Sequence, residues 1–410
     1  MEQLATTRSW EANFRILWSG QFITIIGLTG ITPFLPFYMQ QIGVNDTKTN
    51  LLWSGLALAA PAIAYALTSP IWGRMGDRWS RKWMFVRSLL GLSVSLLCMG
   101  MAQTPLQFFL SRLCQGAFGG ISDASTSFIG SAAPKDKQGL YLGRFQNGVA
   151  AGSLIGPLLG GILADQWGFR PMLFFTGALT GICGILAGFL LKESEREEQQ
   201  SSPPSSGYFP ALKNLMSDPT LRAFLFGGIA AKFGVFGLLA VFGPYVSTFS
   251  TFSSSPTMWI GLLDAATHFG TLLGSSWWGK KNDRSPVEKN FVMASAICGL
   301  LIISQACLPF VAWLFLLRIL QGFFFSSLIQ SVILIVIRTS DDFNRGLSIG
   351  ITNSLLVTGQ IAGSFSGGLL GGYLPFAWII AFMGTVFILS SILVGIMISS
   401  LHKKGSVQQI

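Results

Sequence analysis

Residues 73–82 read GRMGDRWSRK, a strongly charged stretch between two long apolar runs. A shorter version, GKKNDR, returns at residues 279–284, again directly after an apolar run. A shift of 206 residues relates the two stretches, so that Asp77 corresponds to Asp283. That shift, or one of 207, also relates Trp53 to Trp259, Arg112 to Arg318, Gln115 to Gln321, and Gly152, Gly156, Gly160 and Gly161 to Gly359, Gly363, Gly367 and Gly368. One register held over so many unlike residues indicates that the chain is a duplicated half.

The composition is that of a membrane protein, because 50% of the 410 residues are hydrophobic and only 11% are charged. A bilayer core of about 30 Å needs roughly 20 apolar residues per helix. Twelve such runs are present, at about 14–40, 51–73, 83–102, 106–132, 139–164, 171–191, 220–246, 258–279, 290–309, 312–338, 345–372 and 376–399. The first run is too long for a cleavable signal and counts as span one. We therefore expect an all-α polytopic fold with 12 transmembrane helices in two pseudo-symmetric six-helix bundles.

The two bundles are expected at residues 1–191 and 220–399. Between them, KESEREEQQSSPPSSG is polar and rich in Pro and Ser, which predicts a flexible cytoplasmic linker over 192–219. Residues 400–410 are expected to form a cytoplasmic tail.

The net charge of +10 follows the membrane topology rather than a nucleic-acid site. Most Lys and Arg residues fall in loops that share the side of the N-terminus, whereas the opposite loops hold only Lys48 and Arg170. This asymmetry is the positive-inside rule. It predicts a multi-pass protein with both termini in the cytoplasm.

The charged loop at residues 73–82 has two interpretations. Its ion pairs can latch two helix bundles in one conformation, because partly buried charge pairs are costly to break. It can also be a solvated basic loop that serves topology alone. The second copy favours the latch, and the candidate gate residues are Gly73, Asp77, Arg78, Arg81, Lys82, Asp283 and Arg284.

Span four carries Arg112 within the hydrocarbon region, where a charged side chain must face an aqueous cavity or a partner. Asp123 follows eleven residues later, which on a continuous helix places it on the same face, about 16 Å along the axis. Span ten repeats the arginine but has Ile329 at the position of Asp123, so the duplication does not require this carboxylate. We expect a functional role for Asp123; the alternative is a structural pair with Arg144 or another basic residue.

Lys232 lies in span seven, and Asp264 and His268 lie four residues apart on one face of span eight. An intramembrane carboxylate can exchange protons when access alternates between the two sides, and histidine titrates near neutral pH. The alternative is a polar pair that only fixes helix packing. The candidates for proton coupling are Asp264, His268, Asp123 and Arg112; those for the substrate cavity are Arg112, Gln115, Asp123, Lys232, Asp264, His268 and Gln321.

Span five contains Gly152, Gly156, Pro157, Gly160 and Gly161 in the pattern GxxxGPxxGG. Small residues at this spacing allow two helix backbones to approach closely, and the proline adds a bend. The copy in span eleven keeps the glycines but has Ser364 in place of the proline.

Metal and enzyme chemistry find little support in the sequence. The five cysteines lie in the predicted spans, at a spacing that suits neither a zinc site nor a disulfide framework. The chain has no HExxH, GxSxG or phosphate-binding loop. We expect neither an enzyme, nor a metal site, nor a cofactor.

Together these motifs resemble the major facilitator superfamily, specifically the twelve-span drug/proton antiporter branch and its MdtG-like multidrug resistance transporters. GRMGDRWSRK resembles the family's loop between spans two and three, with Ser80 where glycine is usual. RLCQG resembles the span-four motif whose arginine, here Arg112, is linked to proton transfer, and GxxxGPxxGG resembles the span-five antiporter motif. The chain departs from the branch in lacking the acid of span one and the acid before the loop that follows span four.

The resemblance implies two bundles that rock about a central site and exchange protons for a small organic molecule moving outward. The partners would be that molecule, protons and the lipid bilayer of the bacterial inner (cytoplasmic) membrane. The protein would be a monomer that binds no nucleic acid and is driven by the proton gradient. The same fold is compatible with a dedicated exporter of a siderophore or another metabolite, or with a proton-coupled nutrient uptake symporter.

Overall fold

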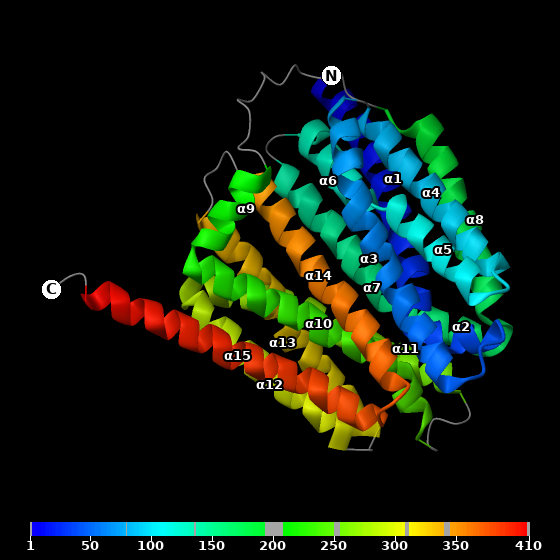
Figure 1. Cartoon of the computed structure of the whole chain (residues 1–410). Coiled ribbons are helices and arrows are strands. Elements are labelled where there is room, and N and C mark those ends of the chain that lie inside the picture. The colour runs from blue at the N-terminus through cyan, green and yellow to red at the C-terminus, as the bar shows by residue number, and fades with distance from the viewer. Residues whose placement is uncertain are drawn as a thin grey trace. The chain divides into compact units, whose positions relative to one another are not determined.

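The computed structural model describes residues 2–78, 80–134, 137–192, 208–249, 255–307, 311–339 and 345–407. Figure 1 shows that these residues form helices joined by short segments. The helices are α1 (Glu2–Ile31), η1 (Thr32–Phe34), α2 (Leu35–Gln41), α3 (Thr47–Arg78), α4 (Arg81–Met101), α5 (Pro105–Ala117), α6 (Ile121–Ala132), α7 (Gln138–Trp167), α8 (Phe169–Leu190), α9 (Tyr208–Ser217), α10 (Pro219–Ser247), α11 (Pro256–Arg284), α12 (Val287–Cys307), α13 (Val311–Thr339), α14 (Arg345–Gly371) and α15 (Phe376–Val407).

The chain divides into two compact units. The first comprises Met1–Glu197 together with Phe252–Ala265, and the second comprises Glu198–Thr251 together with Ala266–Ile410. The start of α11 belongs to the first unit because it binds the end of α7. There the Asp165 carboxylate accepts hydrogen bonds from the Thr257 hydroxyl and from the Met258 backbone N–H, the latter at 3.0 Å.

Both units contain the same tyrosine hydrogen bond. The Tyr38 hydroxyl of α2 donates to the carbonyl oxygen of Met99 in α4 at 2.5 Å. The Tyr245 hydroxyl of α10 donates to the carbonyl oxygen of Gln305 in α12 at 2.7 Å. Because both residues of each pair are related by the repeat, the duplication seen in the sequence extends to individual contacts.

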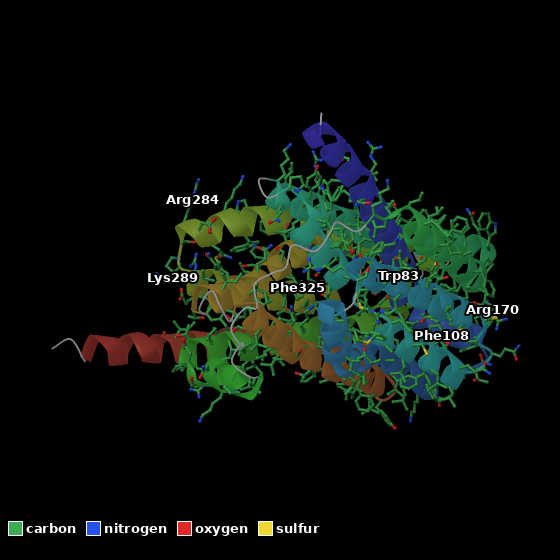
Figure 2. The ribbon with its side chains drawn as sticks, turned by 90° about the horizontal axis from the view of Figure 1, so that it is seen from above. Trp83, Phe108, Arg170, Arg284, Lys289 and Phe325 are labelled. Atoms are coloured by element: carbon green, nitrogen blue, oxygen red, sulfur yellow. The ribbon has the colours of Figure 1, made fainter. Side chains whose placement is uncertain are left out.

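Aromatic packing closes the end of the first unit where α4 meets α5. The ring of Tyr38 lies 4.8 Å from that of Phe108, which begins the buried face of α5. At the same end, the Arg170 guanidinium donates to the carbonyl oxygen of Ala102 at 2.9 Å, and Figure 2 labels Phe108 and Arg170 there. The loop between α4 and α5 is therefore anchored by the start of α8.

The glycines of span five form the contact between α7 and α1. A Cβ atom added at Gly160 would overlap the carbonyl oxygen of Gly30. In the second unit, a Cβ atom at Gly367 of α14 would overlap the carbonyl oxygen of Gly237 in α10. The small-residue pattern thus does what its spacing predicts, because in each unit it brings two helix backbones into direct contact.

Within the described residues, nine helical segments are long and apolar enough to cross a membrane. Three of the twelve predicted runs are absent from that set. The runs at 258–279 and 345–372 are single helices, α11 and α14, but are more polar. The run at 106–132 is not one helix: it is interrupted between α5 and α6, so the expected continuous span four is wrong.

Two segments expected to lack regular structure contain helix. The predicted linker at 192–219 includes α9, which contacts α10 and α14 of the second unit. The last helix, α15, continues through the start of the predicted tail to Val407.

The seam between α1 and α7 predicts the effect of a single methyl group. Gly160→Ala should destabilise the protein by about 1–3 kcal/mol, because the added Cβ forces the two backbones apart. Gly143→Ala is the matched control on the same helix, since a Cβ atom there has open space and alanine favours a helix over glycine by about 1 kcal/mol. The midpoint of thermal unfolding of each purified variant measures the effect. Equal midpoints for the two variants would contradict the close contact.

Candidate functional site

The interruption of span four lies between Ala117, which ends α5, and Ile121, which begins α6. Gly120 has a φ of +92°, a backbone conformation that residues with a Cβ rarely adopt. Phe118 packs directly against Gly91 of α4, where a Cβ atom would overlap the phenylalanine side chain. A glycine at the break and a glycine opposite it therefore allow the chain to turn out of helical register.

The carbonyl groups released by the break are bonded by side chains of α3 and α4. The carbonyl oxygen of Ala117 accepts from the Trp72 indole at 2.6 Å and from the Thr68 hydroxyl at 3.3 Å. The carbonyl oxygen of Gly119 accepts from the Arg87 guanidinium at 3.2 Å. Backbone groups inside a membrane need partners within the protein, and these donors supply them.

The second unit has only part of this arrangement. The Trp278 indole of α11 donates to the carbonyl oxygen of Phe323 at 3.0 Å, which repeats the bond between Trp72 and Ala117. Its acceptor nevertheless lies inside the uninterrupted helix α13. At the position equivalent to Arg87 the second half has Met293. The tryptophan bond therefore belongs to the duplicated fold, whereas the break and its arginine belong to the first half alone.

Asp123 lies in the first turn of α6, directly after the break. Its carboxylate accepts a hydrogen bond from the Tyr65 hydroxyl of α3 at 2.5 Å. The predicted alternative, a pair with Arg144, is not what the structure contains. Arg144 instead approaches the Glu11 carboxylate at 4.0 Å. The partial positive charge of a helix N-terminus favours a carboxylate at this position.

The break also changes the predicted relation between Asp123 and Arg112. Because the helix is interrupted between them, the expectation that they share one face of a continuous helix is wrong. Arg112 is buried in α5, where its guanidinium donates to the carbonyl oxygen of Ala57 at 3.0 Å and to the Gln115 side chain at 2.8 Å. Arg112 and Gln115, both predicted for the substrate cavity, are thus brought together.

Close helix contact explains why Arg112 reaches α3. A Cβ atom at Gly116 would overlap the backbone of Pro61, so α5 and α3 touch at this point. In the second unit, a Cβ atom at Gly322 would likewise overlap the carbonyl oxygen of Thr267.

The repeated arginine has a similar partner in the second unit. Arg318 donates to the Gln321 side-chain oxygen at 3.3 Å, and its guanidinium lies 3.9 Å from the centroid of the Phe242 ring. Gln321 also accepts from the Gln305 amide at 2.9 Å. This predicted cavity residue is therefore part of a buried polar network.

Arg87 is a candidate residue that the sequence analysis missed. Its guanidinium stacks 3.6 Å from the centroid of the Trp72 ring, and one nitrogen bonds the carbonyl oxygen of Gly119. Two further nitrogens, Nε and Nη1, are buried without a hydrogen-bond partner among the described residues. The sequence does contain a signal for Arg87: it is an arginine inside the predicted run 83–102, and the second half has methionine at the equivalent position.

The other predicted coupling residues lie on α10 and α11. Asp264 is buried and His268 is half-buried on α11. Lys232 of α10 is half-buried, with its ammonium 5.6 Å from the centroid of the Phe236 ring. A role for these three residues in coupling or in the cavity stays a prediction. Within the described residues, no group of three or more metal-ligating side chains is found.

The structure describes the side-chain surroundings of only part of the predicted cytoplasmic gate. Gly73, Asp77 and Arg78 lie outside that part. Arg81 reaches the carbonyl oxygen of Ser127 at 3.5 Å, and Lys82 is half-buried. In the second unit, Asp283 and Arg284 are exposed, and Figure 2 labels Arg284. The latch therefore stays a prediction.

Ser80 stands where the family's loop usually has glycine, and it has a structural role. Its hydroxyl accepts a hydrogen bond from the backbone N–H of Trp83 at 3.2 Å and so caps the N-terminus of α4. Serine is among the best residues at that position. This departure from the motif therefore stabilises the helix that carries Arg87.

Comparison with known proteins identifies the family. The family model of the Major Facilitator Superfamily matches residues 17–255 and 230–408. This chain belongs to the major facilitator superfamily. It is 40% identical over 384 residues to the staphyloferrin B transporter of Staphylococcus aureus, which covers 93% of this chain and 92% of that protein. It is 30% identical over 372 residues to the multidrug resistance protein MdtG of Klebsiella pneumoniae, with 90% and 89% covered.

Solved structures of other transporters share the fold at low sequence identity. The bacterial homologue of the lysosomal transporter Spinster has a TM-score of 0.76 at 16% identity, with 95% of each chain covered. The nucleoside transporter NupG has a TM-score of 0.78 at 14% identity, with 94% of this chain and 99% of that chain covered. The chain is thus an all-α, multi-pass membrane transporter of the MdtG-like type and not an enzyme.

The donors at the break give a testable result. Arg87→Met, which introduces the residue of the repeat, should destabilise the protein by about 1–3 kcal/mol because the half-buried carbonyl of Gly119 loses its hydrogen bond from Arg87. Lys289→Met is the control, since Lys289 is an exposed cation of the second unit (Figure 2). Thermal unfolding of the purified variants checks this prediction. If Arg87→Met unfolds at the same temperature as the control, the break does not depend on Arg87.

Proposed function

We propose that this transporter is a proton-coupled exporter of small organic molecules, and that Asp123 carries the coupled proton. The observation that supports this is the difference between the two halves at the break. The first half has a carboxylate and its tyrosine partner beside an interrupted helix, whereas the equivalent residues of the second half are Ile329 and Thr271, on α13 and α11. A feature that a duplicated fold can do without, and that costs free energy in a membrane, is a candidate for function.

The coupling step uses the hydrogen bond between Asp123 and Tyr65. While Asp123 is charged, the tyrosine hydroxyl and the N-terminus of α6 stabilise the carboxylate and join α6 to α3. A proton on the carboxylate removes the charge from this bond. Hydrogen bonds to charged groups contribute about 1.5–3 kcal/mol, which is enough to change the ratio of two conformations by tenfold or more. Proton binding on Asp123 thereby weakens the contact between α3 and α6.

Substrate and proton compete for this carboxylate in the proposed cycle. Access alternates between the two sides of the membrane, as in other secondary transporters built from repeats. Arg112, Gln115, Lys232 and Gln321 contribute to the substrate cavity, and Asp264 with His268 provides a second proton-accepting position. The protein works as a monomer in the bacterial inner membrane, with both termini in the cytoplasm, driven by the proton gradient without a cofactor.

Two observations support the outward direction and the substrate class. The span-five pattern at Gly152–Gly161 resembles the antiporter motif, and a relative at 30% identity is named a multidrug resistance protein. The relative at 40% identity is named a staphyloferrin B transporter. This second name favours a dedicated siderophore exporter as the alternative to export of many unrelated compounds.

The test is transport in liposomes that enclose a pH-sensitive dye and carry an imposed proton gradient. Candidate cations, zwitterions and metal chelators are added one at a time. Proton movement opposite to one compound is the expected result, and that compound then identifies the substrate class. Proton movement in response to one chelator alone supports the siderophore exporter, and proton movement in response to several unrelated compounds supports multidrug export. Protons that move with the compound would make the protein an uptake carrier and overturn the proposal.

The proton site is tested by variants in the same liposomes. Asp123→Asn should abolish substrate-driven proton movement, and Tyr65→Phe should slow it about tenfold because it deletes one hydrogen bond to a charged group. Glu288→Gln, which removes a carboxylate from the first turn of α12, should transport normally. Retained coupling in Asp123→Asn together with its loss in Asp264→Asn would assign the proton to Asp264 instead.

A further inference from the structure

A hollow of about 530 Å³ lies between α1 and α7, close to where the apolar segments Trp10–Gln41 and Leu140–Trp167 begin. Its lining combines two arginines, an indole, an amide and apolar side chains: Arg15, Arg144, Trp18, Asn147, Phe14 and Ile16. None of these residues has a part in the proton site at Asp123. The inference drawn from this hollow is therefore independent of the proposed transport function.

Trp18 forms the wall between the two helices. Its ring lies against Gly148 of α7, where a Cβ atom would overlap the indole nitrogen. The indole N–H donates to the carbonyl oxygen of Arg144 at 3.2 Å, and the ring stacks on Phe22 at 5.0 Å between centroids. These contacts hold the backbone of Arg144 against α1, while its side chain remains half exposed at the hollow.

The charge of the hollow is positive. Among the described residues, the Glu11 carboxylate approaches Arg144 at 4.0 Å, and its oxygen already accepts a hydrogen bond from the Tyr141 hydroxyl at 2.7 Å. Arg15 is exposed and has no hydrogen bond or ion pair to another described residue. Two guanidinium groups are thus available on neighbouring helices, and such pairs match the oxygen atoms of a phosphate group.

The repeat shows that the fold does not require this hollow. The close contacts of the α10–α14 seam relate Trp18 to Leu225 and Arg144 to Ile351, both of which are buried. Of the two arginines, only Arg15 has a basic counterpart, Arg222. At the positions of Trp18 and Arg144, the second half therefore has buried aliphatic side chains, whereas the first half has an open, basic hollow.

The level of the hollow along the helices indicates its occupant. Both α1 and α7 begin on the side that the distribution of Lys and Arg assigns to the cytoplasm. Tryptophan is enriched at the boundary between hydrocarbon and headgroups, and basic pockets between helices on this side of a membrane suit anionic lipid headgroups. Ile16, which is half-buried at the hollow, supplies apolar surface that the upper part of an acyl chain would contact.

From these observations we infer that the hollow binds the phosphate-bearing headgroup of an anionic phospholipid from the cytoplasmic leaflet. The two guanidinium groups bind the phosphate, the Asn147 amide contacts the headgroup, and Trp18 holds the two helices at the spacing that this requires. The bound lipid joins α1 to α7, so it stabilises the first unit at its cytoplasmic end.

The test titrates the purified full-length protein in a neutral detergent with phosphatidylglycerol, with phosphatidylcholine of the same acyl chains, and with inorganic phosphate. The midpoint of thermal unfolding reports binding. Phosphatidylglycerol alone should raise the midpoint of the unmodified protein. Arg15→Gln and Arg144→Gln should each raise the half-saturating concentration of phosphatidylglycerol about fivefold, as expected for the loss of one basic contact with an anionic lipid.

Matched variants separate this site from a general effect of charge. Arg222→Gln removes the counterpart of Arg15 in the second half and should leave the titration unchanged, whereas Arg144→Lys should restore part of the binding that Arg144→Gln loses. An unchanged phosphatidylglycerol response in both arginine-to-glutamine variants would overturn the site. An equal response to inorganic phosphate would also overturn it, because the hollow would then be a site for soluble anions.

Discussion

The hydrogen-bonding demand of the peptide backbone inside a membrane is the constraint on which the first unit depends. An interrupted helix in hydrocarbon leaves carbonyl groups that water cannot reach. Each carbonyl group that stays unbonded destabilises the fold by about 1–3 kcal/mol or more. The break after Ala117 exists because Trp72 and Arg87 bond the released carbonyls. This fixes α3 and α4 against the break, and with them the position of Asp123 at the start of α6.

The duplication separates what the fold needs from what it can change. Both halves keep the tryptophan bond between their second and fourth spans, as Trp72 and Trp278 show. Both also keep the buried arginine with its glutamine neighbour. Only the first half has Arg87, and only there is the helix interrupted. The tryptophan alone does not break a helix, so the additional arginine and the glycine at position 120 are what make the difference.

The sequence predicts the helices well because their length and apolarity are set by the bilayer itself. It predicts the close seams equally well, since the glycines from Gly152 to Gly161 have a spacing that only serves helix contact. It does not predict the break. The pair at Gly160–Gly161 lies inside the continuous helix α7, whereas the pair at Gly119–Gly120 ends a helix. The break also needs space on α4 for Phe118, and a linear pattern cannot show that Gly91 lies opposite that side chain.

The candidate site could be predicted only in part for the same reason. Arg112 and Gln115 are three residues apart on one helix, so their contact follows from helical spacing. The contact between Asp123 and Tyr65 does not follow from helical spacing, because the two residues are 58 positions apart and lie on different helices. Arg87 lies near the end of a span, where an arginine is easily taken for a residue that serves topology.

Two carboxylates of the first unit, Asp165 and Asp123, differ in how they are bonded. Asp165 accepts a backbone N–H and a hydroxyl at the start of α11, so it has two donors there, one of which cannot rotate away. Asp123 accepts from a single side chain, the Tyr65 hydroxyl, which can turn to another acceptor when the carboxylate is neutral. Removing the Asp165 side chain would leave the N-terminus of α11 without this acceptor, whereas the Asp123 carboxylate bonds a tyrosine of another helix and lies at the positive end of α6. This difference in bonding supports Asp123, rather than Asp165, as the coupling residue of the proposed function.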